Sequence, residues 1–103
     1  MVSFNMENNP RSEGHFELGE LVIAPRAKAA IPKNEIDDAL ARHLRLDFGK
    51  KSGDEILYNF TAITFGAGVI RSCYTAQNGK VFLIHTDQRG ETPQTRVFLP
   101  RDY

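Results

Sequence analysis

Residues 69–86 read VIRSCYTAQNGKVFLIHT, and this stretch decides the fold. Residues 69–76 and 80–86 are rich in the β-branched and aromatic side chains that favour strands. Asn78 and Gly79 lie between them, and Asn-Gly flanked by two such runs is the strongest short signal for a β-hairpin. The stretch therefore predicts an antiparallel pair of strands.

The length of the hairpin loop fixes which residues face each other. If Asn78 and Gly79 are the whole loop, Ser72 lies opposite His85 on one side of the ribbon. Arg71 then lies opposite Thr86 on the other side, so Arg71 and His85 are separated by the sheet. Cys73, in the middle of its strand, is expected to be a small buried hydrophobe and not a nucleophile.

The sequence predicts two further strands. Residues 95–99 follow a loop with Gly90 and Pro93 and complete a three-stranded antiparallel meander. Residues 20–24 form a short first strand that ends at Pro25. An exposed edge at residues 95–99 would allow two copies of the chain to pair as a homodimer.

Three helical segments are expected between the first strand and the hairpin. Residues 26–30 form one or two turns before Pro32 stops them. Asn34 is the expected N-cap of the next helix, which ends before Gly49. Its apolar stripe includes His43 and recurs at spacings of three and four residues, at Ile36, Ala39, Leu40 and Leu44.

Residues 52–65 carry conflicting signals. Ser52 and Glu55 form a capping box, whereas several β-branched and aromatic residues after them favour a strand. We interpret the segment as a helix that buries Ile56, Phe60 and Ile63. The chain is then α+β, in the order β-α-α-α-β-β-β, with two to three helices packed on one face of a small, mainly antiparallel sheet.

Length and composition limit the classes of function. The 103 residues predict one domain, residues 16–103, after a flexible N-terminal tail, residues 1–15. Thirteen basic residues balance thirteen acidic ones, which argues against a strongly basic nucleic-acid binder and against a polyanionic mimic of DNA. A single cysteine excludes an intrachain disulfide, and with no apolar run long enough for a membrane span it favours the cytoplasm.

The middle of the chain is mildly basic. Residues 26–51 hold seven basic and four acidic side chains, and four of the basic ones are candidates for binding a phosphate backbone: Arg42, Arg45, Lys50 and Lys51. The alternative interpretation is an ordinary solvated helix surface. No cofactor is predicted, because Gly66-Ala67-Gly68 lacks the third glycine and the following helix of a dinucleotide site.

The three histidines, His15, His43 and His85, are too widely spaced to predict a metal site. His43 is expected to be a buried histidine bonded to backbone, with catalysis as the alternative. His85 with Arg71 is the candidate catalytic pair, because an acid–base histidine beside an arginine suits cleavage of a phosphodiester without a metal. The competing interpretation has His85, Thr86 and Asp87 organising the next loop.

Several short motifs are spread over most of the chain from Gly19 onward. They are Gly19-Glu20-Leu21-Val22-Ile23 with Pro25, Ala41-Arg42-His43, Asp47-Phe48-Gly49, Asn59, Leu99-Pro100 and Tyr103. In these motifs the chain resembles a family of uncharacterised proteins of similar length that are carried on plasmids and integrative elements, some labelled plasmid-related or restriction subunits. Phe48 stands where that family has Trp, and residues 85–89 follow its acidic Thr-Glu-Ala-Asp-Arg stretch only loosely. The resemblance implies a mobile genetic element and no particular reaction.

Three hypotheses of function follow. The first is a small cytoplasmic accessory protein of a mobile element that binds another macromolecule, most simply a protein, and inhibits a host defence system. It rests on the small size, the absence of a convincing catalytic set and a 10% aromatic content that suits a binding surface. The second is a metal-independent ribonuclease or toxin-like enzyme in which His85 is the acid–base group. Binding of nucleic acid through residues 26–51 is a third interpretation.

Overall fold

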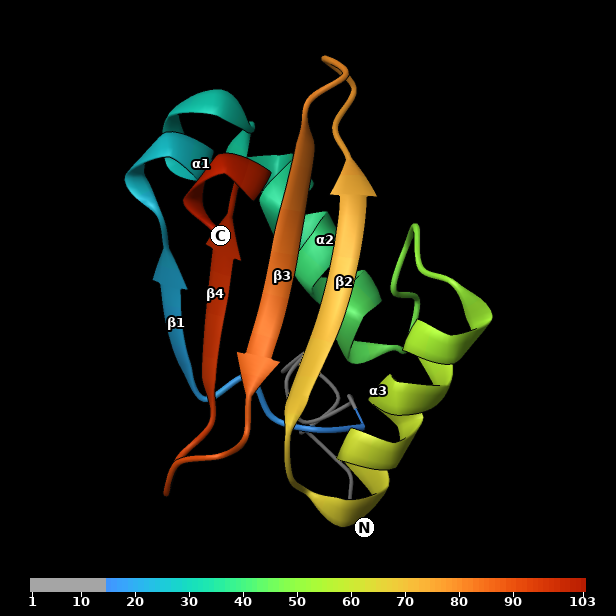
Figure 1. Ribbon diagram of the computed structural model, residues 1–103. Helices are drawn as coiled ribbons and strands as arrows, with labels where there is room; N and C mark the ends of the chain where they lie inside the picture. The colour runs from blue at the N-terminus through green and yellow to red at the C-terminus, as the bar shows by residue number, and fades with distance from the viewer. Residues whose placement is uncertain (1–14) are drawn as a thin grey trace, which may run out of the picture.

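The computed structural model describes residues 15–103 and contains the elements that the sequence predicts, in the predicted order (Figure 1). They are β1 (Glu20–Ile23), α1 (Pro25–Ala30), α2 (Lys33–Leu44), α3 (Gly53–Phe65), β2 (Val69–Thr75), β3 (Val81–Asp87), β4 (Gln94–Phe98) and a 3-10 turn, η2 (Pro100–Asp102). The α+β class is confirmed. The predicted N-terminal tail lies outside the described residues, apart from His15.

The four strands form one sheet in the order β1-β4-β3-β2. β2, β3 and β4 make the predicted antiparallel meander, and β1 joins it parallel to β4. The expectation that residues 95–99 form an exposed edge is wrong, because β4 is hydrogen-bonded to β1 on one side and to β3 on the other. Two copies therefore have no open β4 edge through which to pair.

The hairpin loop is one residue longer than predicted. Ala76 N–H donates to Lys80 O, and Gly79 N–H donates to Ala76 O. Gly79 has φ +88°, so the loop is a tight turn closed by a left-handed glycine, the usual form of a three-residue hairpin. The predicted register is therefore wrong by one residue. Arg71 lies opposite His85, which places both side chains on the same face of the sheet.

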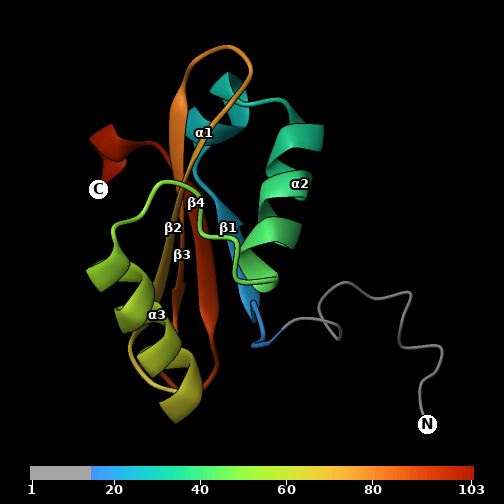
Figure 2. The ribbon, with the colours of Figure 1, turned by 90° about the vertical axis from the view of Figure 1, so that its right-hand side faces the viewer.

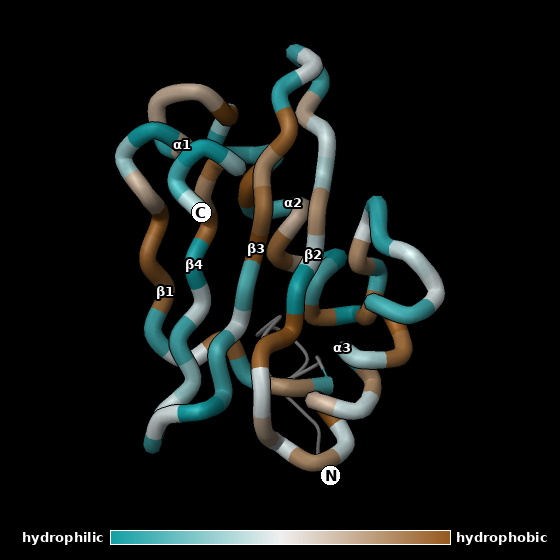
Figure 3. The backbone as a smooth tube through the Cα atoms, in the orientation of Figure 1, coloured by the Kyte–Doolittle hydropathy of each residue, from teal (hydrophilic) through white to brown (hydrophobic). Residues whose placement is uncertain are grey.

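Helices cover one face of the sheet, and the other face is only partly covered. Figure 2 shows α1 and α2 on one side of the strands, with α3 and the C-terminal turn on the other side in that view. The core lies under α1 and α2 and includes Ile36, Leu40 and Leu44 of α2 packed against Ile70, Ile84 and Val97 of the strands. We call the opposite side of the sheet the open face. Figure 3 shows that β3 turns from hydrophobic near the hairpin to hydrophilic at its other end.

α2 confirms the predicted stripe, including the burial of His43, but not the predicted cap. Pro32 occupies the N-cap position and its carbonyl accepts from the amides of Glu35 and Ile36. Because the chain already turns helical directly after Pro32, Asn34 falls inside the first turn. The expectation that Asn34 caps this helix is therefore wrong.

α3 is a helix, as we interpreted it, and not a strand. Its capping box is complete, since Glu55 N–H donates to Ser52 Oγ and Ser52 N–H donates to Glu55 Oε1. The predicted buried face is only partly right: Ile56 and Ile63 are half-buried, but Phe60 is 43% exposed. Asn59 is buried instead, because α3 runs along β2, where it meets the polar backbone of an outer strand.

Candidate functional site

Three side chains line up across the middle of the open face. Arg71 of β2 lies opposite His85 of β3, and His85 lies opposite Arg96 of β4. Since neighbouring residues in register on a sheet share a face, these three side chains form one continuous line. We call Arg71, His85 and Arg96 the arginine row.

Local structure fixes each end of the arginine row. At β2, Asn59 of α3 clamps the backbone of Arg71: Asn59 Nδ2 donates to Arg71 O at 2.8 Å, and Arg71 N–H donates to Asn59 Oδ1 at 3.0 Å. At β4, the guanidinium of Arg96 lies 4.5 Å from the centre of the Phe98 ring. The row is therefore held by hydrogen-bonded backbone on one side and by ring packing on the other.

His85 sits half-buried among aromatic rings. Its ring centre lies 4.8 Å from that of Phe98 and 5.5 Å from that of Tyr103, both in edge contact. Burial lowers the pKa of His85 from 6.5 to about 4, and the positive charges of Arg71, Lys51 and Arg96 act in the same direction. At neutral pH the imidazole is therefore uncharged, and the charge of the row comes from its two arginines.

Among residues 15–103, four arginines form no ion pair, Arg45, Arg71, Arg96 and Arg101, and two of these, Arg71 and Arg96, flank His85 on the sheet. Arg26, Arg42 and Arg89 form ion pairs with Asp102, Asp47 and Asp87. Among residues 15–103, neither Arg71 nor Arg96 has a carboxylate within ion-pair distance. The row therefore presents two guanidinium groups whose charge is not neutralised by a direct partner in the described structure.

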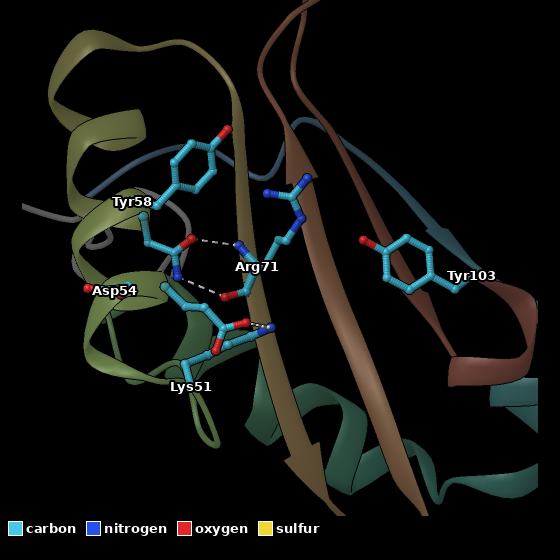
Figure 4. Close-up of a pocket in the computed structure, with 7 residues that line it drawn as sticks. Lys51, Asp54, Tyr58, Arg71 and Tyr103 are labelled. Carbon is cyan, nitrogen blue, oxygen red and sulfur yellow. Dashed lines mark hydrogen bonds and ion pairs between the residues drawn. The ribbon is translucent and has the colours of Figure 1, made fainter.

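A cavity of about 370 Å³ adjoins the row where α3, β2 and the C-terminal turn meet. We call it the tyrosine pocket, and its lining residues are Lys51, Asp54, Glu55, Tyr58, Asn59, Arg71 and Tyr103. Figure 4 shows Tyr58 and Tyr103 on either side of the Arg71 side chain. The Arg71 guanidinium lies 5.6 Å from the centre of the Tyr58 ring, and the ion pair between Lys51 and Glu55 is long, at 3.5 Å.

Tyr103 reaches the open face because the C-terminal turn folds back over the sheet. The turn is tied to α1 by the ion pair between Arg26 and Asp102, at 2.6 Å. The Tyr103 ring then packs edge-on against Phe98, with ring centres 5.9 Å apart. Tyr103 is nevertheless 79% exposed, so most of its ring surface is available to a ligand.

The structure brings together only some of the residues predicted as a site. Arg71 and His85 are neighbours, and Lys51 lines the tyrosine pocket beside them. Arg45 and Lys50 are exposed without a place in that pocket. Arg42 lies on the α2 side, where it pairs with Asp47 at 2.8 Å and stacks 4.8 Å above Tyr74.

His43 lies on the covered face and is separated from His85 by the sheet. It is fully buried, and its ring nitrogens bond to side chains, Ser72 and Thr86, and not to backbone as expected. Thr95 Oγ1 donates to Leu18 O, so Thr86 must donate to Thr95. Thr86 then accepts from His43 Nε2–H, and Nδ1 accepts from the Ser72 hydroxyl.

This buried network holds His43 neutral. Burial lowers its pKa from 6.5 to about 3, and the nearby His85 acts in the same direction. Each hydroxyl and each ring nitrogen has a partner, so the network satisfies the polar groups that the core encloses. His43 is therefore a structural residue of the core, with no access to a ligand on the open face.

Sequence reasoning missed Arg96, Tyr58, Tyr103 and Asn59. Arg96 lies two residues before Phe98 and shares its face of β4, but its alignment with His85 depends on the loop between β3 and β4. Tyr58 was weighed only as one of the aromatic residues that favour a strand in residues 52–65. A three-residue hairpin loop at residues 77–79 would have placed Arg71 beside His85.

No protein-family model matches the chain, and the searches of curated proteins and of solved structures give no match either. Among residues 15–103, no group of three or more His, Cys, Asp or Glu side chains could hold a metal ion. In the same part of the chain no helix is long and apolar enough to cross a membrane.

Proposed function

We propose that this protein binds another macromolecule by receiving one of its anionic groups on the arginine row. The observation that carries the proposal is the pair of guanidinium groups, on Arg71 and Arg96, that flank His85 without an ion-pair partner among residues 15–103. A guanidinium offers a planar fork of N–H donors that matches carboxylate and phosphate oxygens. An anion at the row would relieve the repulsion between the two like charges.

The backbone of the arginine row is held in place before any ligand binds. β3 and β4 are the two inner strands of the sheet, and the backbone of Arg71 is clamped by Asn59. Groups held in place before binding lose little conformational entropy when a ligand arrives. Neutral His85 adds an uncharged N–H donor between the two cations, so the row can donate hydrogen bonds along its length.

The resemblance to proteins of plasmids and integrative elements supports placing this binding activity on a mobile genetic element. A small protein that covers a charged surface of its partner acts by blocking that surface. Inhibition of a host defence system is a role of this kind, and it is the one we propose. It requires no catalysis by the protein itself.

The proposal can be tested with simple anions. We would titrate the isotope-labelled protein with inorganic phosphate and with a short oligoglutamate peptide, and follow the resonances of Arg71, His85 and Arg96. At least one anion should shift these resonances, and the Arg71→Gln/Arg96→Gln double variant should lose the effect. The control is Lys28→Gln/Lys80→Gln, which removes the same charge from exposed positions elsewhere. If no anion shifts the row, the proposed function is wrong.

A metal-independent ribonuclease is the second candidate, because Arg71 and His85 share a face in direct register. His85 would accept the proton of a ribose 2′-hydroxyl as its oxygen attacks the adjacent phosphorus. The bond to the 5′ oxygen would break, leaving a 2′,3′-cyclic phosphate and a 5′-hydroxyl that takes its proton from water. A pKa of about 4 makes His85 a weak base, which ranks this candidate second.

Cleavage is tested by incubating the protein with a labelled RNA in the presence of a chelator. His85→Ala should abolish cyclic-phosphate product while the fold stays intact if the protein is an enzyme. Intact RNA with the native protein, over a range of pH that includes weakly acidic conditions, would reject this candidate and leave the binding function standing.

A further inference from the structure

We infer that the anionic partner is a single-stranded nucleic acid, with a backbone phosphate on the arginine row and a base in the tyrosine pocket. The inference rests on the proposed function and adds the chemical class of the partner. It draws on the aromatic side chains and the carboxylates around the row, which binding of an anion alone does not require.

The positive charge of the arginine row is confined to a small area, because carboxylates lie on both sides of it. Asp54 and Glu55 lie at the α3 side, in the lining of the tyrosine pocket. Asp87 and Glu20 lie in the next line of side chains across the same face. Duplex nucleic acid places phosphates at close, regular intervals and would meet these carboxylates. The open face therefore suits one or two phosphates of a flexible strand, which is also consistent with the net charge of zero.

The tyrosine pocket supplies what a base requires. Tyr58 is 46% exposed and Tyr103 is 79% exposed, and they lie on either side of Arg71 (Figure 4). Proteins that bind single strands combine aromatic rings, on which bases stack, with cations that follow the backbone. A base placed against either ring would have the Arg71 guanidinium within reach of its own phosphate. This juxtaposition of ring and cation is the core of the inference.

The carboxylates of the pocket fit a nucleotide better than an acidic peptide. Asp54 can accept a hydrogen bond from an exocyclic amino group or from a ribose 2′-hydroxyl, and Glu55 can do so with the lone pairs left by its contacts with Ser52 N–H and Lys51. The same carboxylates would repel the side chains of an acidic peptide. An acidic peptide would also leave the two exposed tyrosines without a role.

The test compares labelled probes by fluorescence anisotropy at one ionic strength: a short single-stranded RNA, the matching DNA, the RNA duplex and an oligoglutamate peptide. We expect the single strands to bind at least about tenfold more tightly than the duplex or the peptide. Tighter binding of RNA than of DNA would indicate that the protein contacts the 2′-hydroxyl. Equal binding would indicate that it contacts only the phosphate and the base, which both strands share. The DNA arm also excludes cleavage through a 2′-hydroxyl as a source of the signal.

Variants separate stacking from charge. Tyr58→Leu and Tyr103→Leu should each weaken binding of the single strand by about fivefold or more, while inorganic phosphate should still shift the resonances of the arginine row in both variants. Phe65→Leu is the matched control, because Phe65 is a 76% exposed aromatic residue on the same helix as Tyr58 but outside the pocket lining. It should leave the affinity unaltered.

Three results would overturn the inference. Binding of the peptide or of the duplex as tightly as the single strand would do so, and the first of these would assign the row to an acidic protein partner. Unchanged affinity in both tyrosine variants would remove the base from the pocket. In each case, resonance shifts of the arginine row on addition of inorganic phosphate would leave the proposed function standing. If no anion binds, both the proposed function and this inference are wrong.

Discussion

Arg71 and His85 face each other across β2 and β3 on the open face of the sheet. The Arg71 side chain is a cation and the His85 side chain is half-buried, so the arginine disfavours the protonated form of the histidine. His85 stays neutral at physiological pH because burial and three neighbouring cations disfavour its protonated form. The pKa of His85 should therefore change whenever the charge of the open face changes.

Neutralising Arg71 should raise the pKa of His85. In Arg71→Gln we expect the value to move upward from about 4, and to stop below the ordinary 6.5 because burial, the larger cause, remains. Bound phosphate should move the pKa in the same direction. The measurement is a histidine titration by NMR. Lys28→Gln is the control, and an unchanged titration of His85 in Arg71→Gln would show that the two side chains do not interact.

Stability should fall as the solution becomes acidic, because His43 is neutral in the folded protein. Its folded pKa of about 3 lies below the ordinary 6.5, so between these values the unfolded chain binds more protons than the folded one. The contribution of His43 to the free energy of unfolding should therefore drop by about 1.4 kcal/mol for each pH unit between its unfolded and folded pKa values, from about 6 to about 3. Urea unfolding over this range measures the slope.

His85 contributes to the same slope, since its pKa is also lowered, to about 4. His85→Gln removes that contribution and leaves the part that belongs to His43. A free energy of unfolding that does not change between pH 6 and pH 4 in this variant would contradict the buried, neutral state of His43.

Ser72→Ala should destabilise the protein by about 1–3 kcal/mol, because His43 Nδ1 loses its donor in the core. The exposed Thr75, on the same strand, is the matched control, and Thr75→Ala should change stability by less than about 0.5 kcal/mol. Thermal or urea unfolding gives both values. Nitrogen shifts of the native protein should show the His43 proton on Nε2, and a proton on Nδ1 would contradict the direction of the network.

Asn59→Ala should also cost about 1–3 kcal/mol and should speed hydrogen exchange at the amide of Arg71, which loses its acceptor. Asn34→Ala is the control, because Asn34 makes no cap to α2 and should tolerate the change within about 0.5 kcal/mol. Equal losses in the two variants would mean that the clamp on β2 contributes nothing.

The parts of the fold that rest on local signals could be predicted from the sequence. The hairpin followed from Asn78-Gly79, the start of α3 from the capping box of Ser52 and Glu55, and the buried stripe of α2 from its spacing. The register of the hairpin could not, because Asn-Gly occurs in both two-residue and three-residue loops, and the two differ at Asn78, which lacks the positive φ that a two-residue type I′ turn requires.

The site depended on relationships that are not local. Arg71 and His85 were both singled out, but the register error placed them on opposite faces. Arg96 joined them through the loop between β3 and β4, whose length does not determine a register. Asn59 fell on a helical face expected to be apolar, because nothing in the sequence shows that α3 runs beside an outer strand.

The two hydrogen bonds of Asn59 have a consequence for how this sheet can grow. A primary amide carries the same donor and acceptor as a peptide group, so Asn59 takes the place of one residue of a fifth strand. Further along β2, residues 48–50 do the same, through the bonds of Cys73 with Phe48 and Lys50. Any recruitment of an additional strand, by another copy or by a misfolded chain, is thereby directed to β1, which offers only the four residues Glu20–Ile23 as a template.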